Sequence, residues 1–150
     1  MDEIDRALLR LLQINASLTS EALGRNLGLS ASQAGRRRAR LEAEGYVRSI
    51  QARLDPAKLG LTVQAFVQVQ MATHAPQQAR AFLRMLDARP EIAGVWTLTG
   101  EADYLLRVWC SDLAELNTLI HQALLPHEAV ARVHSQIVMD QPKRDAPLPV

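Results

Sequence analysis

Apolar residues near the start of the chain recur at three- and four-residue steps, which is the spacing of one face of a helix. The steps run from Ile4 to Ile14 and predict an amphipathic helix of about 12 residues. Thr19 is a residue type that caps helix N-termini, and the apolar positions after it stop at Gly28, a common C-terminal residue. These two signals predict a second, short helix.

A third helix is predicted directly after this turn. Ser30 is followed three residues later by Gln33, the spacing of a capping box, and the helical pattern runs to Glu44 before Gly45. Two helices joined by a three-residue turn that contains Gly form the signature of a helix-turn-helix motif. Apolar and polar residues then alternate over 46–54, which predicts a strand and makes the motif a winged one.

From residue 61 onward the hydrophobic period changes to two. Residues 63–71 alternate between apolar and mostly polar side chains, as in a strand with one buried face. The remaining predicted elements are a helix opening at Pro76, strands at 92–99 and 104–110, a helix capped by Asp112 and a strand at 130–139. This βαββαβ order is the ferredoxin-like arrangement, one antiparallel sheet with two helices on one face.

The predicted fold class is therefore α+β, with two domains. A helix-turn-helix domain covers residues 1–45, a linker strand covers 46–60 and the ferredoxin-like domain covers 61–140. Residues 141–150 contain three Pro and are expected to form a flexible tail. Because the sheet leaves its second face and its edges uncovered, we expect the chain to self-associate.

Composition narrows the possible classes. With 48% apolar and 22% charged residues, the chain is neither disordered nor fibrous. No run of about 18 uncharged apolar residues occurs and the first residues are acidic, so we expect a cytoplasmic protein without a membrane segment. The four His and the single Cys110 lack zinc-site spacing, and no phosphate loop or nucleophile motif occurs. We therefore predict no metal, no cofactor and no catalytic residue.

The near-zero net charge conceals an asymmetry between the two halves of the chain. Residues 1–60 hold ten Lys and Arg against seven Asp and Glu, whereas residues 61–150 hold seven against nine. Four Arg fall within the five positions 36–40. Such a cluster in an otherwise balanced chain indicates a partner that carries phosphates, unless it is only a solvated helix face.

The order of these motifs resembles that of the Lrp/AsnC regulators, the leucine- and asparagine-responsive family. The residues that carry the resemblance are Ile4-Asp5-Arg6, Leu29-Ser30, Arg36-Arg37, Arg40-Leu41-Glu42, Glu44-Gly45 and the hairpin segment from Gly100-Glu101-Ala102-Asp103 to Tyr104-Leu105-Leu106. The resemblance implies a homodimer, often assembled further into octamers. It also implies that the first domain binds double-stranded DNA and that the second binds a small-molecule effector, an amino acid or a related compound.

Outward positions on the predicted third helix are the candidates for DNA contact. Helical spacing leaves Ser32, Gln33, Arg36, Arg37 and Arg40 pointing outward. Residues near the helix start reach base edges in the major groove. We therefore assign base contacts to Ser32, Gln33 and Arg36, and phosphate contacts to Arg37 and Arg40. The alternative for each of them is a solvated surface side chain.

One inner position departs from the family pattern. The inner face by the same spacing comprises Ala31, Ala34, Arg38 and Leu41. Regulators of the family usually have an aliphatic side chain where this chain has Arg38. Because a buried guanidinium without a partner is costly, we expect it to reach the surface or to meet the carboxylate of Glu42, Asp5 or Glu21.

The hairpin between the second and third strands is the candidate effector site. Gly100 allows backbone N–H groups to converge on a carboxylate, and Asp103 offers a counter-charge for an ammonium group. The resemblance places the family's effector pocket at the same hairpin, with Ser135 on the last strand where Thr is usual. The predicted effector-binding residues are Thr99, Gly100, Asp103, Tyr104 and Ser135. The alternative is that Gly-x-x-Asp only forms a tight turn.

Two other function classes are open from the sequence. Sirohaem decarboxylases share this two-domain architecture, but resemblance to them would require histidines on the sheet strands, and residues 95–97 and 107–109 contain none. A sensor module that binds a small molecule without touching DNA is the other alternative. The arginines at 36–40 speak against it.

Overall fold

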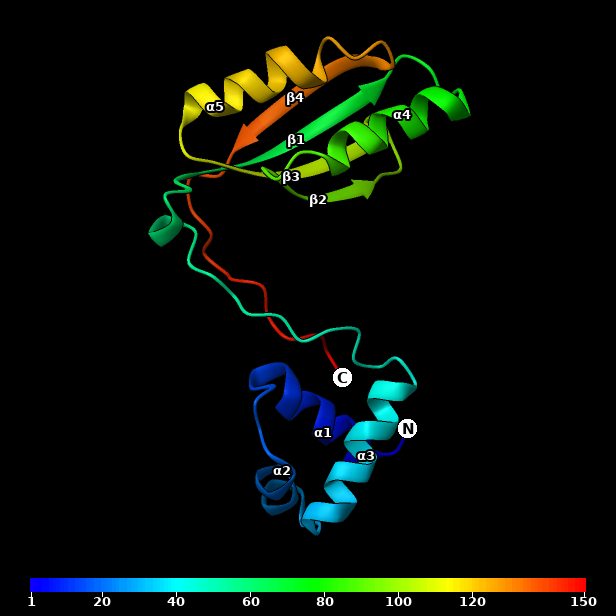
Figure 1. Ribbon diagram of the computed structural model, residues 1–150, viewed down its shortest axis with the longest axis vertical. Helices are drawn as coiled ribbons and strands as arrows, with labels where there is room; N and C mark the ends of the chain where they lie inside the picture. The colour runs from blue at the N-terminus through cyan, green and yellow to red at the C-terminus, as the bar shows by residue number, and fades with distance from the viewer. The chain divides into compact units, whose positions relative to one another are not determined.

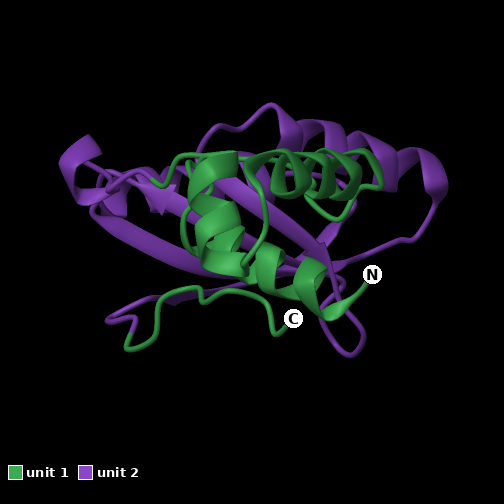
Figure 2. Ribbon diagram, turned by 90° about the horizontal axis from the view of Figure 1, so that it is seen from below, with its two compact units in different colours: residues 1–53, 142–150 green, residues 54–141 purple.

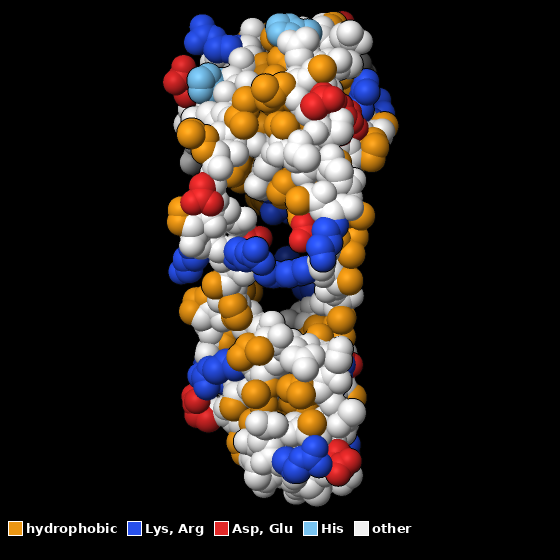
Figure 3. Space-filling view, turned by 90° about the vertical axis from the view of Figure 1, so that its left-hand side faces the viewer, with side chains coloured by type: hydrophobic (Ala, Val, Ile, Leu, Met, Phe, Trp, Pro, Cys, Tyr) orange, Lys and Arg blue, Asp and Glu red, His pale blue; other side chains and the backbone are white.

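The computed structural model describes all 150 residues, and they form two compact units. Unit 1 comprises residues 1–53 and 142–150, and unit 2 comprises residues 54–141 (Figure 2). None of the helices has both the length and the apolar character needed to cross a membrane. Hydrophobic side chains also reach the surface of both units, where they lie among charged ones (Figure 3).

Unit 1 contains three helices (Figure 1): α1 (Glu3–Ile14), α2 (Ser20–Leu27) and α3 (Ala31–Ala43). The predicted caps are confirmed, since the side chain of Thr19 accepts a hydrogen bond at the start of α2 and Ser30 forms a capping box with Gln33. A single apolar cluster joins the helices and comprises Leu8, Leu9, Leu12, Leu23, Ala34 and Leu41.

The turn between α2 and α3 depends on two glycines. Gly28 caps α2 in the left-handed conformation, with a φ of 68°. Residues that have a Cβ rarely adopt this conformation. Gly24 lies where the chain folds back on itself. A Cβ at this position would be 2.6 Å from the backbone oxygen of Leu29. The predicted helix-turn-helix is thus confirmed, with its close backbone approach at Gly24.

The expected strand at 46–54 is wrong, and unit 1 therefore has no wing. These residues have no regular secondary structure, and the four strands of the chain all belong to unit 2. A strand persists only where its N–H and C=O groups pair with a neighbouring strand. Within this chain no neighbouring strand pairs with residues 46–54, and Tyr46 and Ile50 are exposed.

The segment expected to be a flexible tail packs against unit 1. Gln13 of α1 donates a hydrogen bond to the carbonyl of Leu148 and accepts one from its N–H group, at 3.1 and 2.6 Å. Val150 packs against the apolar cluster, and Arg53 donates to the carbonyl of Asp145. Residues 142–150 are thus part of unit 1, although their composition is that of a loose tail.

Unit 2 has the predicted βαββαβ order. A short 3-10 turn, η1 (Ala57–Leu59), comes first. The elements that follow it are β1 (Val63–Met71), α4 (Pro76–Asp87), β2 (Ile92–Thr97), β3 (Tyr104–Cys110), α5 (Leu113–Thr118) continued by the π-helical η2 (Leu119–Leu124), and β4 (Val130–Ile137). The strands pair antiparallel in the order β2-β3-β1-β4. The ferredoxin-like arrangement is therefore confirmed.

Both helices of unit 2 cover the same face of the sheet (Figure 1). Alternate residues of β1 point to this face, and Ala65, Val67 and Val69 are completely buried there against Phe82 and Leu86 of α4. We call the opposite side, which no helix covers, the open face. Strand alternation places every second residue of β1, β3 and β4 on it.

Gly24 in α2 and Gly35 in α3 provide a test of the packing at the turn. We expect Gly24→Ala to lower the free energy of unfolding by about 1–3 kcal/mol, because the added methyl group meets rigid backbone. Gly35→Ala is the matched control, since its Cβ would meet only the side chain of Ser20, whose nearest atom is the rotatable hydroxyl at 3.0 Å, and the exchange raises helix propensity. Urea denaturation of both variants measures the difference. Equal stability of the two would contradict the close approach.

Candidate functional site

One buried carboxylate connects the N-terminal end of α1 to α3. The side chain of Asp5 is only 1% exposed, and it is the one charged residue in the buried set. Its two oxygens lie 2.8 Å from Nη1 of Arg37 and 2.7 Å from Nη2 of Arg40. It also accepts the backbone N–H of Asp2, whose own carboxylate pairs with Arg37 at 2.7 Å. The four side chains form one ionic network.

Hydrogen bonds determine the charge state of this network. Burial by itself would raise the pKa of Asp5, but the hydrogen bonds from the Asp2 backbone and from Arg40 and Arg37 outweigh it and hold the pKa well below its usual range. The same contacts raise the pKa of both arginines, through Asp2 and Asp5 for Arg37 and through Asp5 for Arg40. The network is therefore ionised at neutral pH.

The structure brings four of the five predicted DNA-contact residues around one hollow. Gln33, Arg36, Arg37 and Arg40 line it together with Asp2 and Leu29, and it encloses about 480 Å³. Ser32 is exposed on the first turn of α3 but does not line the hollow. Arg36 is also exposed, and its Nε donates only a long hydrogen bond, 3.4 Å, to the carbonyl of Ser32.

The inner face of α3 is partly as predicted. Ala34 and Leu41 are fully buried, whereas Ala31, the first residue of the helix, is exposed. Arg38 is half-buried, and its Nε donates to Glu42 at 2.8 Å while Nη1 donates to the carbonyl of Leu18 at 3.0 Å. Of the three acids named from the sequence, Glu42 is thus its partner.

In unit 2 the hairpin residues predicted to bind an effector have different environments. Thr99 and Gly100 are exposed, and Gly100 has a φ of 108°. Asp103 is used by the fold, because its Oδ2 accepts the N–H of Met71 at 2.7 Å and its own N–H donates to the carbonyl of Val69. Its Oδ1 lies 3.3 Å from the imidazole of His74. The carboxylate thus fastens the hairpin to the end of β1.

Tyr104 and Ser135 lie on the helix-covered side of the sheet. The ring of Tyr104 packs against Phe82 of α4, with centroids 5.6 Å apart. Ser135 pairs in register with the buried Val67, and paired residues share a face. Tyr104 and Ser135 thus share the helix-covered side of the sheet, whereas Thr99 and Gly100 are exposed in the hairpin.

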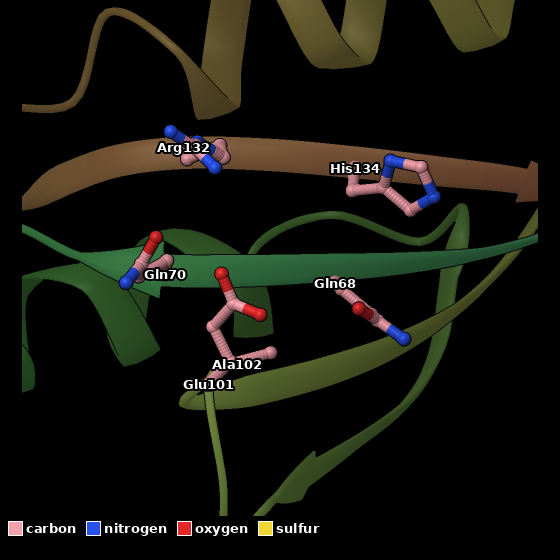
Figure 4. Close-up of a pocket in the computed structure, with 6 residues that line it drawn as sticks. All are labelled: Gln68, Gln70, Glu101, Ala102, Arg132 and His134. Atoms are coloured by element: carbon pink, nitrogen blue, oxygen red, sulfur yellow. The ribbon is translucent and has the colours of Figure 1, made fainter.

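A hollow on the open face was missed from the sequence (Figure 4). We call it the polar hollow. It encloses about 300 Å³ and is lined by Gln68, Gln70, Glu101, Ala102, Arg132 and His134. The register pairs Gln68 with His134 and Gln70 with Arg132, so β1 and β4 present these side chains on one face. Polar residues at alternate positions of two strands were the available signal, but strand pairing could not be read from one sequence.

No group of three or more His, Cys, Asp or Glu residues is arranged to hold a metal ion. Cys110 is buried in the core of unit 2, and burial, followed by the nearby Glu115, Glu91 and Asp112, raises its pKa to about 11. Its thiol is therefore protonated at neutral pH and a poor nucleophile.

Comparison with known proteins gives two matches to families along the chain. Residues 1–42 match the AsnC-type helix-turn-helix domain, and residues 64–148 match the Lrp/AsnC ligand binding domain. The DNA-binding transcriptional activator DecR of Escherichia coli K12 is 33% identical over 150 residues, which is 100% of this chain and 99% of that protein.

Solved structures agree with these matches. The transcriptional regulator NMB0573 of Neisseria meningitidis, in complex with L-Met, has a TM-score of 0.94 and 33% identity, over 99% of this chain and 96% of that one. An AsnC family regulator of Agrobacterium tumefaciens has a TM-score of 0.91 and 32% identity, over 99% and 97%. The relatives are named as transcriptional regulators, and the decarboxylase alternative is not favoured. The chain therefore belongs to the Lrp/AsnC family and is an effector-responsive, DNA-binding transcriptional regulator rather than an enzyme.

Proposed function

We propose that this regulator acts in the cytoplasm as a homodimer, assembled further into a species such as an octamer, and that its effector is an amino acid. We further propose that α3 contacts double-stranded DNA through Ser32, Gln33, Arg36, Arg37 and Arg40. The observation that carries the DNA proposal is the hollow on α3, around which four of these five side chains gather.

The start of α3 is suited to reading base edges. Ser32, Gln33 and Arg36 are exposed on its first turns, the part of a recognition helix that enters the major groove. The capping box uses the Oε1 atom of Gln33, and the Nε2 group is left to donate to a base. Arg36 has only the long contact to a backbone carbonyl, so its guanidinium can turn toward a guanine.

Arg37 and Arg40 are suited to hold phosphates in fixed positions. Each guanidinium donates to carboxylates through a single terminal nitrogen, Nη1 in Arg37 and Nη2 in Arg40. A guanidinium has five N–H donors, and these side chains remain 29% and 45% exposed. The remaining donors can bind phosphate while Asp5 restricts the side chains, which reduces the entropy lost on binding.

The open face of unit 2 supports the proposed dimer. Phe66, Trp96, Leu105 and Trp109 form an apolar patch there, with the Arg107 guanidinium 5.7 Å from the ring centroid of Trp96. Trp96 is 44% exposed. If a second copy of the chain packed its own apolar patch against this one about a two-fold axis, both patches would be buried. Two α3 helices would then bind half-sites about one helical turn apart, or a multiple of it.

The amino-acid effector is supported by the relative from Neisseria, whose structure holds L-Met, and by the match to the ligand binding domain over residues 64–148. The hairpin residues Thr99, Gly100, Asp103 and Tyr104, with Ser135, remain the proposed region of the effector site. In this chain the polar hollow lies beside that hairpin, because Glu101 and Ala102 belong to both.

DNA binding by α3 can be tested with single alanine variants on a fragment selected by the wild-type protein. We expect Arg36→Ala to cost about 1–3 kcal/mol on that fragment and little on random DNA. Arg40→Ala should weaken both equally and lower the slope of log affinity against log salt by about 1. Arg80→Ala, on the exposed surface of α4, is the control in gel retardation. Wild-type affinity in both α3 variants would remove α3 from the interface.

The Asp5 network gives a prediction on stability and pH. Asp5→Asn removes the charge between two arginines, and we expect a loss of about 3 kcal/mol of unfolding free energy at pH 7. Because the folded pKa of Asp5 is lowered, its stabilisation is complete above the ordinary Asp pKa of 3.8, which holds in the unfolded chain, and is lost as pH falls below that value. Thermal melts at pH 7 and pH 3 should show the gap to wild type narrowing. Asp87→Asn, exposed on α4, should change little at either pH.

The dimer proposal predicts the hydrodynamic behaviour of the chain. Sedimentation at micromolar concentration should show at least a dimer, and Leu105→Glu, which places a charge in the apolar patch, should shift the population toward monomer. Leu83→Glu, on the exposed side of α4, should leave the assembly unchanged. A monomeric wild type would overturn the proposal.

A further inference from the structure

We propose that the polar hollow on the open face of unit 2 binds an α-amino acid whose side chain carries an amide or a carboxylate. The inference rests on the proposed amino-acid effector and adds to it the place of binding and the class of ligand. The observation behind it is that six side chains from three separate segments, β1, the β2–β3 hairpin and β4, line one hollow (Figure 4).

The polar groups of the hollow are available for a ligand. The side chains of Gln68, Gln70, Glu101, Arg132 and His134 take part in no hydrogen bond or ion pair within the chain. Asp103 differs, since its carboxylate already accepts the N–H of Met71 and faces His74. Within the hairpin, Glu101 is thus the acid that is free to meet a ligand, whereas Asp103 serves the fold.

The charges of the hollow match those of a zwitterion. Arg132 projects from β4 and Glu101 from the hairpin, on the two sides of β1 in Figure 4. An α-carboxylate can accept paired hydrogen bonds from the Arg132 guanidinium, and an α-ammonium can donate to Glu101. A simple acid or a simple amine would satisfy only one of the two charges.

The remaining lining selects the side chain of the ligand. Gln68, Gln70 and His134 present amide and imidazole groups, and Ala102 is the only apolar residue of the hollow. An aliphatic ligand would cover these groups without replacing their hydrogen bonds to water, which costs binding energy. An amide or carboxylate side chain restores them. The volume of about 300 Å³ is at the small end of ligand sites and fits one amino acid.

The position of the hollow connects binding to assembly. Gln68 pairs in register with His134 on one side and with Leu105 of the apolar patch on the other. A ligand in the hollow would therefore lie beside the surface on which the proposed dimer forms. Differential affinity for one assembly state is what allows such a ligand to shift the population.

Isothermal titration of the full-length chain tests the proposal. The probes are Asn, Gln, Asp and Glu against Leu, Met and Val. We expect at least one polar amino acid to bind about tenfold tighter or better than every apolar one. Arg132→Ala and Glu101→Gln should each weaken that binding by about tenfold or more, the effect of losing a charge-assisted hydrogen bond. Arg80→Ala and Asp87→Asn, exposed on α4, are the charge-matched controls and should bind like wild type.

The outcomes separate this proposal from the proposed function. Binding that survives Arg132→Ala and Glu101→Gln but is lost in Asp103→Asn would place the ligand at the hairpin turn and overturn the polar hollow alone. Tightest binding of Leu, Met or Val would overturn the ligand class, with an amino-acid effector intact. If no amino acid binds or alters DNA retardation when the titration is extended to all twenty, the amino-acid effector itself is wrong. Unchanged melting temperatures of the variants establish that they are folded.

Discussion

A buried carboxylate determines how the helices of unit 1 fit together. Removing an ion from water costs several kcal/mol unless it is paired and hydrogen-bonded, and Asp5 is 1% exposed. Arg37 and Arg40 supply the compensating charges from α3. Two basic residues of α3 therefore hold α1 and α3 together.

This constraint divides the arginines of α3 into different kinds. Arg37 and Arg40 are restrained through Asp5, whereas Arg36 keeps most of its rotational freedom and Arg38 pairs with Glu42 along the helix. A restrained guanidinium loses less entropy when a phosphate binds, and a free one can adapt to a base edge. Four arginines that look alike in the sequence thus have three different physical roles.

In unit 2 one sheet serves two purposes because strand alternation separates its faces. Val67 and Val69 of β1 build the core under α4 and α5, while Gln68 and Gln70 between them face the open side. Antiparallel pairing with β4 then sets Arg132 and His134 beside these amides. The hairpin brings Glu101 to the same place, so the polar hollow follows from the register of the sheet.

The sequence by itself determined what depends on neighbours a few residues away. The capping box of Ser30 and Gln33, the end of α2 at Gly28 and the alternation along β1 all follow from local hydrogen bonding and side-chain period. Alternation also suggested a strand at 46–54, which failed because a strand needs a partner that periodicity does not provide. Tertiary structure alone decided the pairing of Asp5 with Arg40, 35 residues apart, and of Asp103 with Met71, 32 residues apart. A period tells which face a side chain occupies, but only the packed fold tells which group it meets there.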